Sequence, residues 1–265
     1  MINSRKKHFA GFTLVEMAIV LVILGFVLTA LLLPLKAQRD GLFQSQTQTT
    51  LENAKRALLG FAQQQGRLPC PATAASNGME WPLAGGTCTQ QVGFLPAATL
   101  GIQPTDAQGF ALDAWSNRIS YAVTQNSSAL IANPVTPDFT TNIADDPTTP
   151  LINEADGINV VGIASLTPNL RVCATSAAAN CTAAINLTSN AVVVIYSTGA
   201  TGAQGSAGKP DEIENLNAAG APLTDTVFVS HDINASNGAT EFDHLVVWIS
   251  PFVLYNAMIE AGQLH

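Results

Sequence analysis

The most unusual chemical group in this sequence is a single carboxylate inside an apolar stretch. Glu16 is the only charged residue between Phe12 and Leu35. A carboxylate among apolar side chains is costly, and in proteins such a group normally has a partner. The sequence therefore predicts a specific pairing for Glu16 rather than a plain apolar segment.

Two imidazoles lie beside carboxylates, in His231-Asp232 and Asp243-His244. Such pairs occur in acid–base catalysis. Neither a Gly-x-Ser-x-Gly nor a His-Glu-x-x-His motif accompanies them. We therefore expect polar histidines of loops or strand ends, and no enzymatic activity.

The charges that surround these groups are few and unevenly placed. Charged residues make up 11% of the chain, against about 25% in an average soluble domain. A basic leader, Arg5 to Lys7, precedes the apolar stretch, whereas residues 68–265 contain three basic and 16 acidic side chains. This acidic surface argues against direct nucleic-acid binding.

The apolar stretch is long enough to span a bilayer. As a helix, Phe12–Leu33 would measure about 33 Å, against a bilayer core of about 30 Å. The basic leader predicts a cytoplasmic N-terminus and a body on the opposite side of the membrane. A secretory signal peptide and a plain membrane anchor are the alternatives, but both leave Glu16 unexplained.

The residues around this carboxylate read Lys6-Lys7-His8-Phe9-Ala10-Gly11-Phe12-Thr13-Leu14-Val15-Glu16-Met17. This segment resembles the N-terminal signal of type IV pilins and type II secretion pseudopilins. The resemblance implies cleavage by prepilin peptidase between Gly11 and Phe12 and N-methylation of Phe12. It also implies that Glu16 pairs with the N-terminal amine of a neighbouring subunit during assembly.

The same resemblance implies one long N-terminal helix. We expect a cleaved leader (1–11), a transmembrane and assembly helix (12–35) with a kink at Pro34, and a periplasmic half of the stem (36–66). An apolar stripe recurs at helical spacing along that half, and Gly66 and Pro69 end it. Its members are Leu42, Leu51, Ala54, Leu58, Phe61 and Ala62.

Residues 67–265 should form an α+β body with an antiparallel sheet packed on the stem helix. Glycine- and proline-rich loops are expected over 68–112 and 134–157. Pro251 suits the first turn of a closing helix, Phe252–Ala261, capped by Ser250 and ended by Gly262. The runs with strand character are Arg118–Val123, Val160–Ala164, Ala191–Tyr196, Thr226–Ser230 and Leu245–Ile249.

Two body segments resemble parts of major pseudopilins. Leu112–Tyr121 is similar to a turn rich in Asp, Trp and Asn that leads into the first strand, although Ala114 and Ser116 stand where that pattern has Pro and Gly. The segment from Ile195 resembles a calcium loop, although Thr201 replaces an acidic residue. Calcium is the cofactor it implies, and a solvated loop is the alternative. The candidate ligands are Asp211, Glu212, Glu214, Asn215, Asn217 and Asp225.

Four cysteines lie beyond the apolar stretch, on the side of the membrane expected to be oxidising. An even number there predicts two disulfides, with three possible connectivities. We favour Cys70–Cys88 and Cys173–Cys181, because each would close a loop with little regular structure.

These features predict a structural, prepilin-like subunit of the bacterial inner membrane that later enters a filament. Its expected partners are prepilin peptidase, other pilin or pseudopilin subunits, the inner-membrane assembly platform and membrane lipid. The filament is either a type II secretion pseudopilus or a type IV pilus. The alternative is a minor pilin whose body is an adhesin or binding module.

Overall fold

A computed structural model of the protein describes residues 13–83, 88–124, 138–140, 158, 163, 166–176, 181, 185–216, 227–234 and 238–264, without the side chains of 30–37, 138 and 203. The elements are α1 (Leu14–Gln65), β1 (Val92–Phe94), α2 (Ala97–Leu100), β2 (Ser120–Val123), η1 (Asp138–Thr140), β3 (Leu170–Cys173), β4 (Asn186–Ala191), β5 (Val193–Ser197), α4 (Gly202–Gly205), α5 (Pro210–Asn215), β6 (Val227–Val229), β7 (Leu245–Ile249) and α6 (Pro251–Glu260). Two compact units divide at Phe43/Gln44, so α1 contributes to both.

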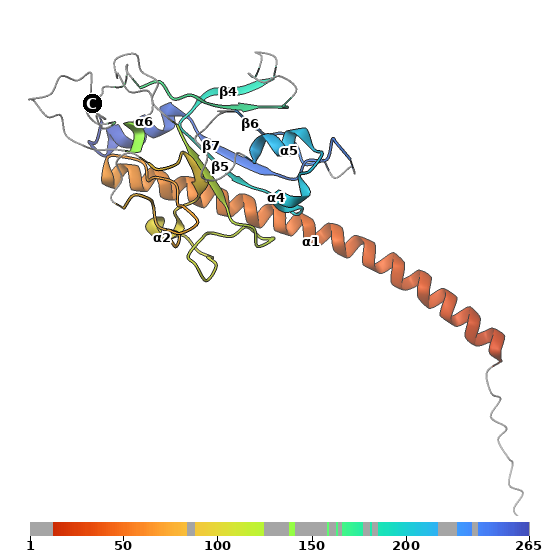
Figure 1. Ribbon diagram of the computed structural model, residues 1–265. Coiled ribbons are helices and arrows are strands. Elements are labelled where there is room, and N and C mark those ends of the chain that lie inside the picture. The colour runs from red at the N-terminus through yellow and green to blue at the C-terminus, as the bar shows by residue number, and fades with distance from the viewer. Residues whose placement is uncertain are drawn as a thin grey trace, which may run out of the picture. The chain divides into compact units, whose positions relative to one another are not determined.

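The body is built on a four-stranded antiparallel sheet in the order β1-β2-β5-β7 (Figure 1). Successive side chains of a strand point to opposite faces, and β5 shows this alternation clearly. Val193 and Ile195 pack into one cluster, and Val194 and Tyr196 into another. The sheet is therefore covered on both faces, and β5 is buried along its whole length.

Helices cover the first face of this sheet. The part of α1 that lies in the body presents a buried stripe of Leu51, Ala54, Leu58 and Ala62, each 0% exposed. Residues of α6, including Leu254 and Met258, join the same cluster. The predicted stripe is confirmed at these four α1 positions. Leu42, in the other unit, is 69% exposed and does not belong to it.

A second, three-stranded sheet packs on the opposite face, in the order β4-β3-β6. In it β3 is antiparallel to β4 but parallel to β6. The α+β class is therefore confirmed, but the expectation of one antiparallel sheet was incomplete. The other two strands of this sheet were not predicted. β4 reads NLTSNA and is largely polar, with no apolar alternation, and β3 has only four residues.

The helix ends follow local chemistry. Gly66 has φ +68° and its N–H donates to the carbonyl of Ala62, so α1 ends in a left-handed turn that glycine tolerates best. Pro251 begins α6, one residue before the predicted start. Ser250 holds the N-cap position, but its side chain makes no capping hydrogen bond, which corrects the expected capping role.

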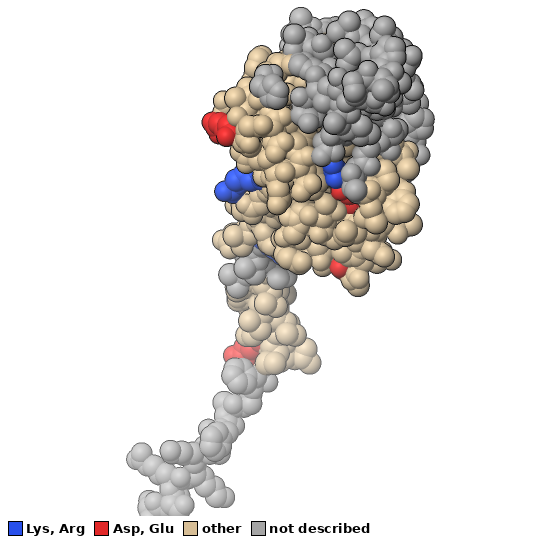
Figure 2. All heavy atoms as spheres, turned by 90° about the vertical axis from the view of Figure 1, so that its left-hand side faces the viewer, with Lys and Arg blue, Asp and Glu red and all other residues tan. Residues whose placement is uncertain are grey.

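The strand predictions agree with β2, β5, β6 and β7 to within two residues at their ends. Of the predicted strand 160–164 the structure describes only Ile163, which is helical. Of the predicted loop 134–157 it describes only η1. On the face in Figure 2, the described surface carries few charged side chains, as the composition predicts.

Candidate functional site

Glu16 lies in the first turn of α1, two residues after Leu14, which starts the helix. Its Oε2 accepts hydrogen bonds from the backbone N–H of Thr13 at 2.8 Å and from the Thr13 hydroxyl at 2.9 Å. The Glu16 N–H in turn donates to Thr13 Oγ1 at 3.3 Å. This reciprocal pattern is a capping box, which satisfies N–H groups that have no partner within the helix. Gly11 and Phe12 lie outside the described residues.

On both sides of Glu16 along the chain, the helix exposes large apolar side chains. Leu14, Leu21 and Phe26 are 88%, 64% and 74% exposed. A shallow apolar hollow of about 340 Å³ runs along one side between Leu14 and Ile23. Such a surface needs a covering of lipid or of other apolar helices. Within the part of the chain that the structure describes, no helix is long and apolar enough to cross a membrane.

Pro34 lies within α1, which runs without interruption from Leu14 to Gln65. The side chain of Pro34 is outside the described set. The kink at this position therefore stays a prediction.

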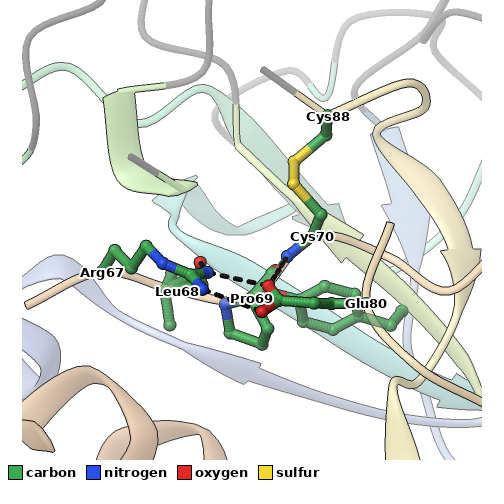
Figure 3. Close-up of a disulfide and its surroundings, with 7 residues drawn as sticks. Arg67, Leu68, Pro69, Cys70, Glu80 and Cys88 are labelled. Atoms are coloured by element: carbon green, nitrogen blue, oxygen red, sulfur yellow. Dashed lines mark hydrogen bonds and ion pairs between the residues drawn. A yellow bond between two sulfur atoms is a disulfide. The ribbon is translucent and has the colours of Figure 1, made fainter. Parts of the chain in front are cut away.

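The end of α1 is joined to the body by a buried ion pair beside a disulfide (Figure 3). Nη1 and Nη2 of Arg67 donate to the carboxylate of Glu80, at 2.7 and 2.8 Å. The N–H of Cys70 donates to the same carboxylate at 3.3 Å, and Cys70 is bonded to Cys88. The hydroxyl of Tyr121 on β2 donates to the Pro69 carbonyl at 2.9 Å, which ties this corner to the sheet.

The second disulfide joins Cys173, the last residue of β3, to Cys181, with 5.6 Å between their Cα atoms. The structure thus has the disulfide pairing that we favoured from the sequence. Each bond closes a short loop, of 18 and 8 residues in sequence separation.

The turn at residues 113–117 connects α1 to two strands. Asp113 Oδ1 accepts the N–H groups of Trp115 and Asn117, at 2.9 and 2.8 Å, while its Oδ2 accepts the Ser197 hydroxyl at 2.6 Å. The expected structural role of the Asp and Asn side chains is therefore confirmed. Ser116 has φ +71°, a conformation that favours glycine, the residue of the pattern that this segment resembles.

Those residues of the predicted calcium site that the structure describes do not converge on one point. Asp211 Oδ1 accepts hydrogen bonds from Thr175 and Ser176, on the β3 side of α5. Asn215 is fully buried and holds the backbone of Val229 through both atoms of its amide. Glu212 points elsewhere, to the N–H of Asp243. Glu214 is half-buried, and Asn217 and Asp225 lie outside the described residues.

His244 is held in a buried polar network just before β7. The backbone of Val229 fixes the orientation of the Asn215 amide, whose nitrogen donates to His244 Nδ1 at 3.3 Å. Because Nδ1 is the acceptor, Nε2 of the neutral ring carries the proton and donates to the Ser206 hydroxyl at 3.3 Å. The hydrogen-bonded series Asn215, His244 and Ser206 resembles a catalytic relay in its residue types. However, Ser206 is 0% and His244 2% exposed, so the hydroxyl is not accessible to a substrate. His244 lies at the end of a strand, as predicted, and its network joins α5 to the segment before β7.

Burial, together with the nearby charge of Lys209, lowers the pKa of His244 to about 4. Unfolding restores the usual pKa of about 6.5, so between these values the unfolded chain binds more protons than the folded one. We expect the free energy of unfolding to fall by about 3 kcal/mol on this account as the pH drops from 6.5 to 4. Thermal unfolding of wild type and His244→Gln across this range should show a shallower acid dependence in the variant. The same dependence of stability on pH in both proteins would contradict the assignment of this acid destabilisation to His244.

His231, the other histidine, is half-buried at the wall of a cavity of about 570 Å³. Its Nε2 lies 3.2 Å from Asp211 Oδ2, and its ring stacks on Phe242 with centroids 3.9 Å apart. The remaining lining is mixed and consists of small or medium-sized side chains. Its polar members are Thr175, Ser176, Asn234 and Thr240, and its apolar members are Ala174, Pro210 and Ala239. Sequence reasoning missed this cavity because the residues after β3, the start of α5 and residues 231–234 and 239–240 come together only in the folded chain.

Residues 6–32 match the family model of the prokaryotic N-terminal methylation motif. The matched range includes Gly11, Phe12 and Glu16, and it supports the assignment to the type IV pilin and pseudopilin family. Proteins with this motif are structural subunits rather than enzymes, and the motif implies processing by prepilin peptidase and assembly with other pilin subunits. No curated protein and no solved structure matches the chain significantly.

Proposed function

We propose that this protein is a structural, prepilin-like subunit of a type II secretion pseudopilus or a type IV pilus. The observation that carries the proposal is the methylation motif at the start of an exposed apolar helix. Prepilin peptidase cuts between Gly11 and Phe12, Phe12 is N-methylated, and the helix then packs against the helices of other subunits. The inner-membrane assembly platform is the partner that brings the subunits together.

Before assembly, residues 12–35 anchor the chain in the bacterial inner membrane. The basic leader favours a cytoplasmic N-terminus. Both disulfides belong to the body, and disulfides persist in oxidising compartments such as the periplasm. These observations support a single-pass topology with a periplasmic body.

Gly11→Val tests the processing step. A peptidase approaches the glycine carbonyl closely because no side chain covers it, and a β-branched residue removes that access. We expect the variant to accumulate as the uncleaved precursor and to be absent from filaments, as measured by electrophoretic mobility and the mass of the N-terminal peptide. Gly25→Ala is the matched control, since a Cβ there meets nothing within 4 Å. Normal cleavage of Gly11→Val would place the processing site elsewhere.

Deletion of the gene distinguishes a type IV pilus from a type II secretion pseudopilus. Loss of surface fibres or twitching indicates a pilus, whereas loss of enzyme export indicates a secretion pseudopilus. The cavity beside His231 supports the second candidate, a minor pilin whose body is a binding module for surface attachment or DNA uptake. That role predicts intact filaments and export, with attachment or uptake lost.

A further inference from the structure

A lysine ammonium lies inside the body, next to the glycine-rich loop that resembles a calcium-binding segment. Lys209 is only 8% exposed. Its Nζ lies 3.2 Å from Oε2 of Glu241 and 3.5 Å from Oε2 of Glu212. Lysine is almost never buried to this degree without an anionic partner. The two carboxylates around this cation therefore account for its burial.

The oxygens that calcium would need already have protein donors. Calcium requires six to eight oxygens around one point. Asp211 Oδ1 is occupied by three hydrogen bonds from Thr175 and Ser176, and Asn215 Oδ1 by the Val229 N–H. The described members of the predicted ligand set therefore do not fit a calcium ion.

A different group in the described residues comes closer to a metal site. Ligand atoms of Glu212, Asp243 and His244 lie within 4.8 Å of one another. Oε2 of Glu212 is buried and has no hydrogen-bond donor in good geometry among the described residues, so it is the oxygen of this group that most needs a cation. That same oxygen faces Lys209 Nζ, whose charge would repel a divalent ion.

The charges in this cluster agree with an internal ion pair. Burial would lower the pKa of Lys209, but the carboxylates of Glu241 and Glu212 raise it above its usual value. Burial and the neighbouring charge of Asp243 raise the pKa of Glu212. The lysine is therefore charged at neutral pH, where it offsets the negative charge that the three acidic residues bring together.

We propose that Lys209 is the resident cation of residues 199–216, the described part of the segment that resembles a calcium loop. We also propose that the body reaches its full stability without a bound metal ion. The ammonium joins the start of α5 to Glu241, while Glu212 Oε1 accepts the Asp243 N–H at 3.1 Å. The lysine thus holds α5 against the segment that leads into β7. This inference does not depend on the assembly role proposed above.

Thermal unfolding of the full-length chain in detergent, followed by tryptophan fluorescence, tests this inference. We expect the same Tm for wild type in EDTA, in millimolar calcium and in millimolar zinc, and no metal retained on purification when measured by mass spectrometry. We expect Lys209→Met to lower the Tm by at least about 4 °C, because it leaves buried carboxylates without their cation. Lys209→Arg, which keeps the charge, should retain most of the stability.

Lys55→Met is the matched control, since it removes a lysine from the partly exposed surface of α1 and should leave the Tm within about 1 °C. A rise of several degrees in the wild-type Tm with calcium or zinc would overturn the inference in favour of a metal site. A Lys209→Met Tm equal to that of the control would overturn it as well. If Lys209→Met fails to fold, the wild-type comparison between EDTA and metal still decides.

Discussion

Glu16→Ala is expected to be inserted and cleaved normally but to lose entry into filaments, by about tenfold or more, because the ion pair that we propose between Glu16 and the N-terminal amine of a neighbouring subunit is lost. Cleavage exposes the α-amine of Phe12, and Glu16 is the only carboxylate in the apolar segment that could pair with it. The measurement is an immunoblot of the sheared filament fraction against whole cells, with the N-terminal mass as evidence of cleavage.

Glu16 also closes the capping box with Thr13, so the loss of a cap must be separated from the loss of a charge. Glu16→Gln does this, because glutamine can occupy the same position in a capping box but carries no charge. We expect Glu16→Gln to be excluded from filaments like Glu16→Ala, and Glu52→Ala, on the body part of α1, to enter them normally. Incorporation of Glu16→Gln at the wild-type level would show that charge pairing is not required.

Glu80→Ala is expected to reduce the free energy of unfolding of the body by about 3–5 kcal/mol, because it leaves a buried guanidinium unpaired. Arg67 and Glu80 side chains are 4% and 5% exposed, and Arg67 has few alternatives to this carboxylate apart from the Leu68 carbonyl and the face of Phe61. In a domain of this size the loss corresponds to a fall in Tm of roughly 6–20 °C. Thermal unfolding of the full-length protein measures it.

The double variant Arg67→Met/Glu80→Leu distinguishes a buried unpaired charge from a general packing defect. Replacing both partners by apolar residues removes the unpaired charge, so we expect it to regain most of the stability that Glu80→Ala loses. Glu52→Ala, at a partly exposed position, should change stability by less than about 0.5 kcal/mol. A loss in Glu80→Ala no larger than in Glu52→Ala would contradict the role of the pair.

The sequence was informative wherever the determinant is local. The apolar spacing of Leu51, Ala54, Leu58 and Ala62 predicted the buried face of α1, and Gly66 marked its end. Continuous apolar runs predicted β5 and β7, since strands covered on both faces need apolar residues on both. The favoured cysteine pairs agree with the structure because each closes a short loop.

The sequence was uninformative where distant segments meet. Residues 211–215 suggested one shared metal site, but in α5 their side chains diverge to β3, to β6 and to the segment before β7. Nothing in the spacing of Arg67 and Glu80 indicates a buried pair. Charged residues thirteen positions apart in a glycine- and proline-rich segment are usually solvated, and only the fold around Cys70 desolvates them.

By itself the sequence determined the methylation motif, the position of the single carboxylate in the apolar stretch and the α+β class, because each depends on residue type and short-range spacing. Only the tertiary structure decided that a second sheet completes the core, that His244 is buried and neutral, and that Lys209 lies between two carboxylates. The physical reason is that burial and pairing of polar groups depend on which segments pack together. A solvated charge and a buried one have the same letter in the sequence, but their free energies differ by several kcal/mol.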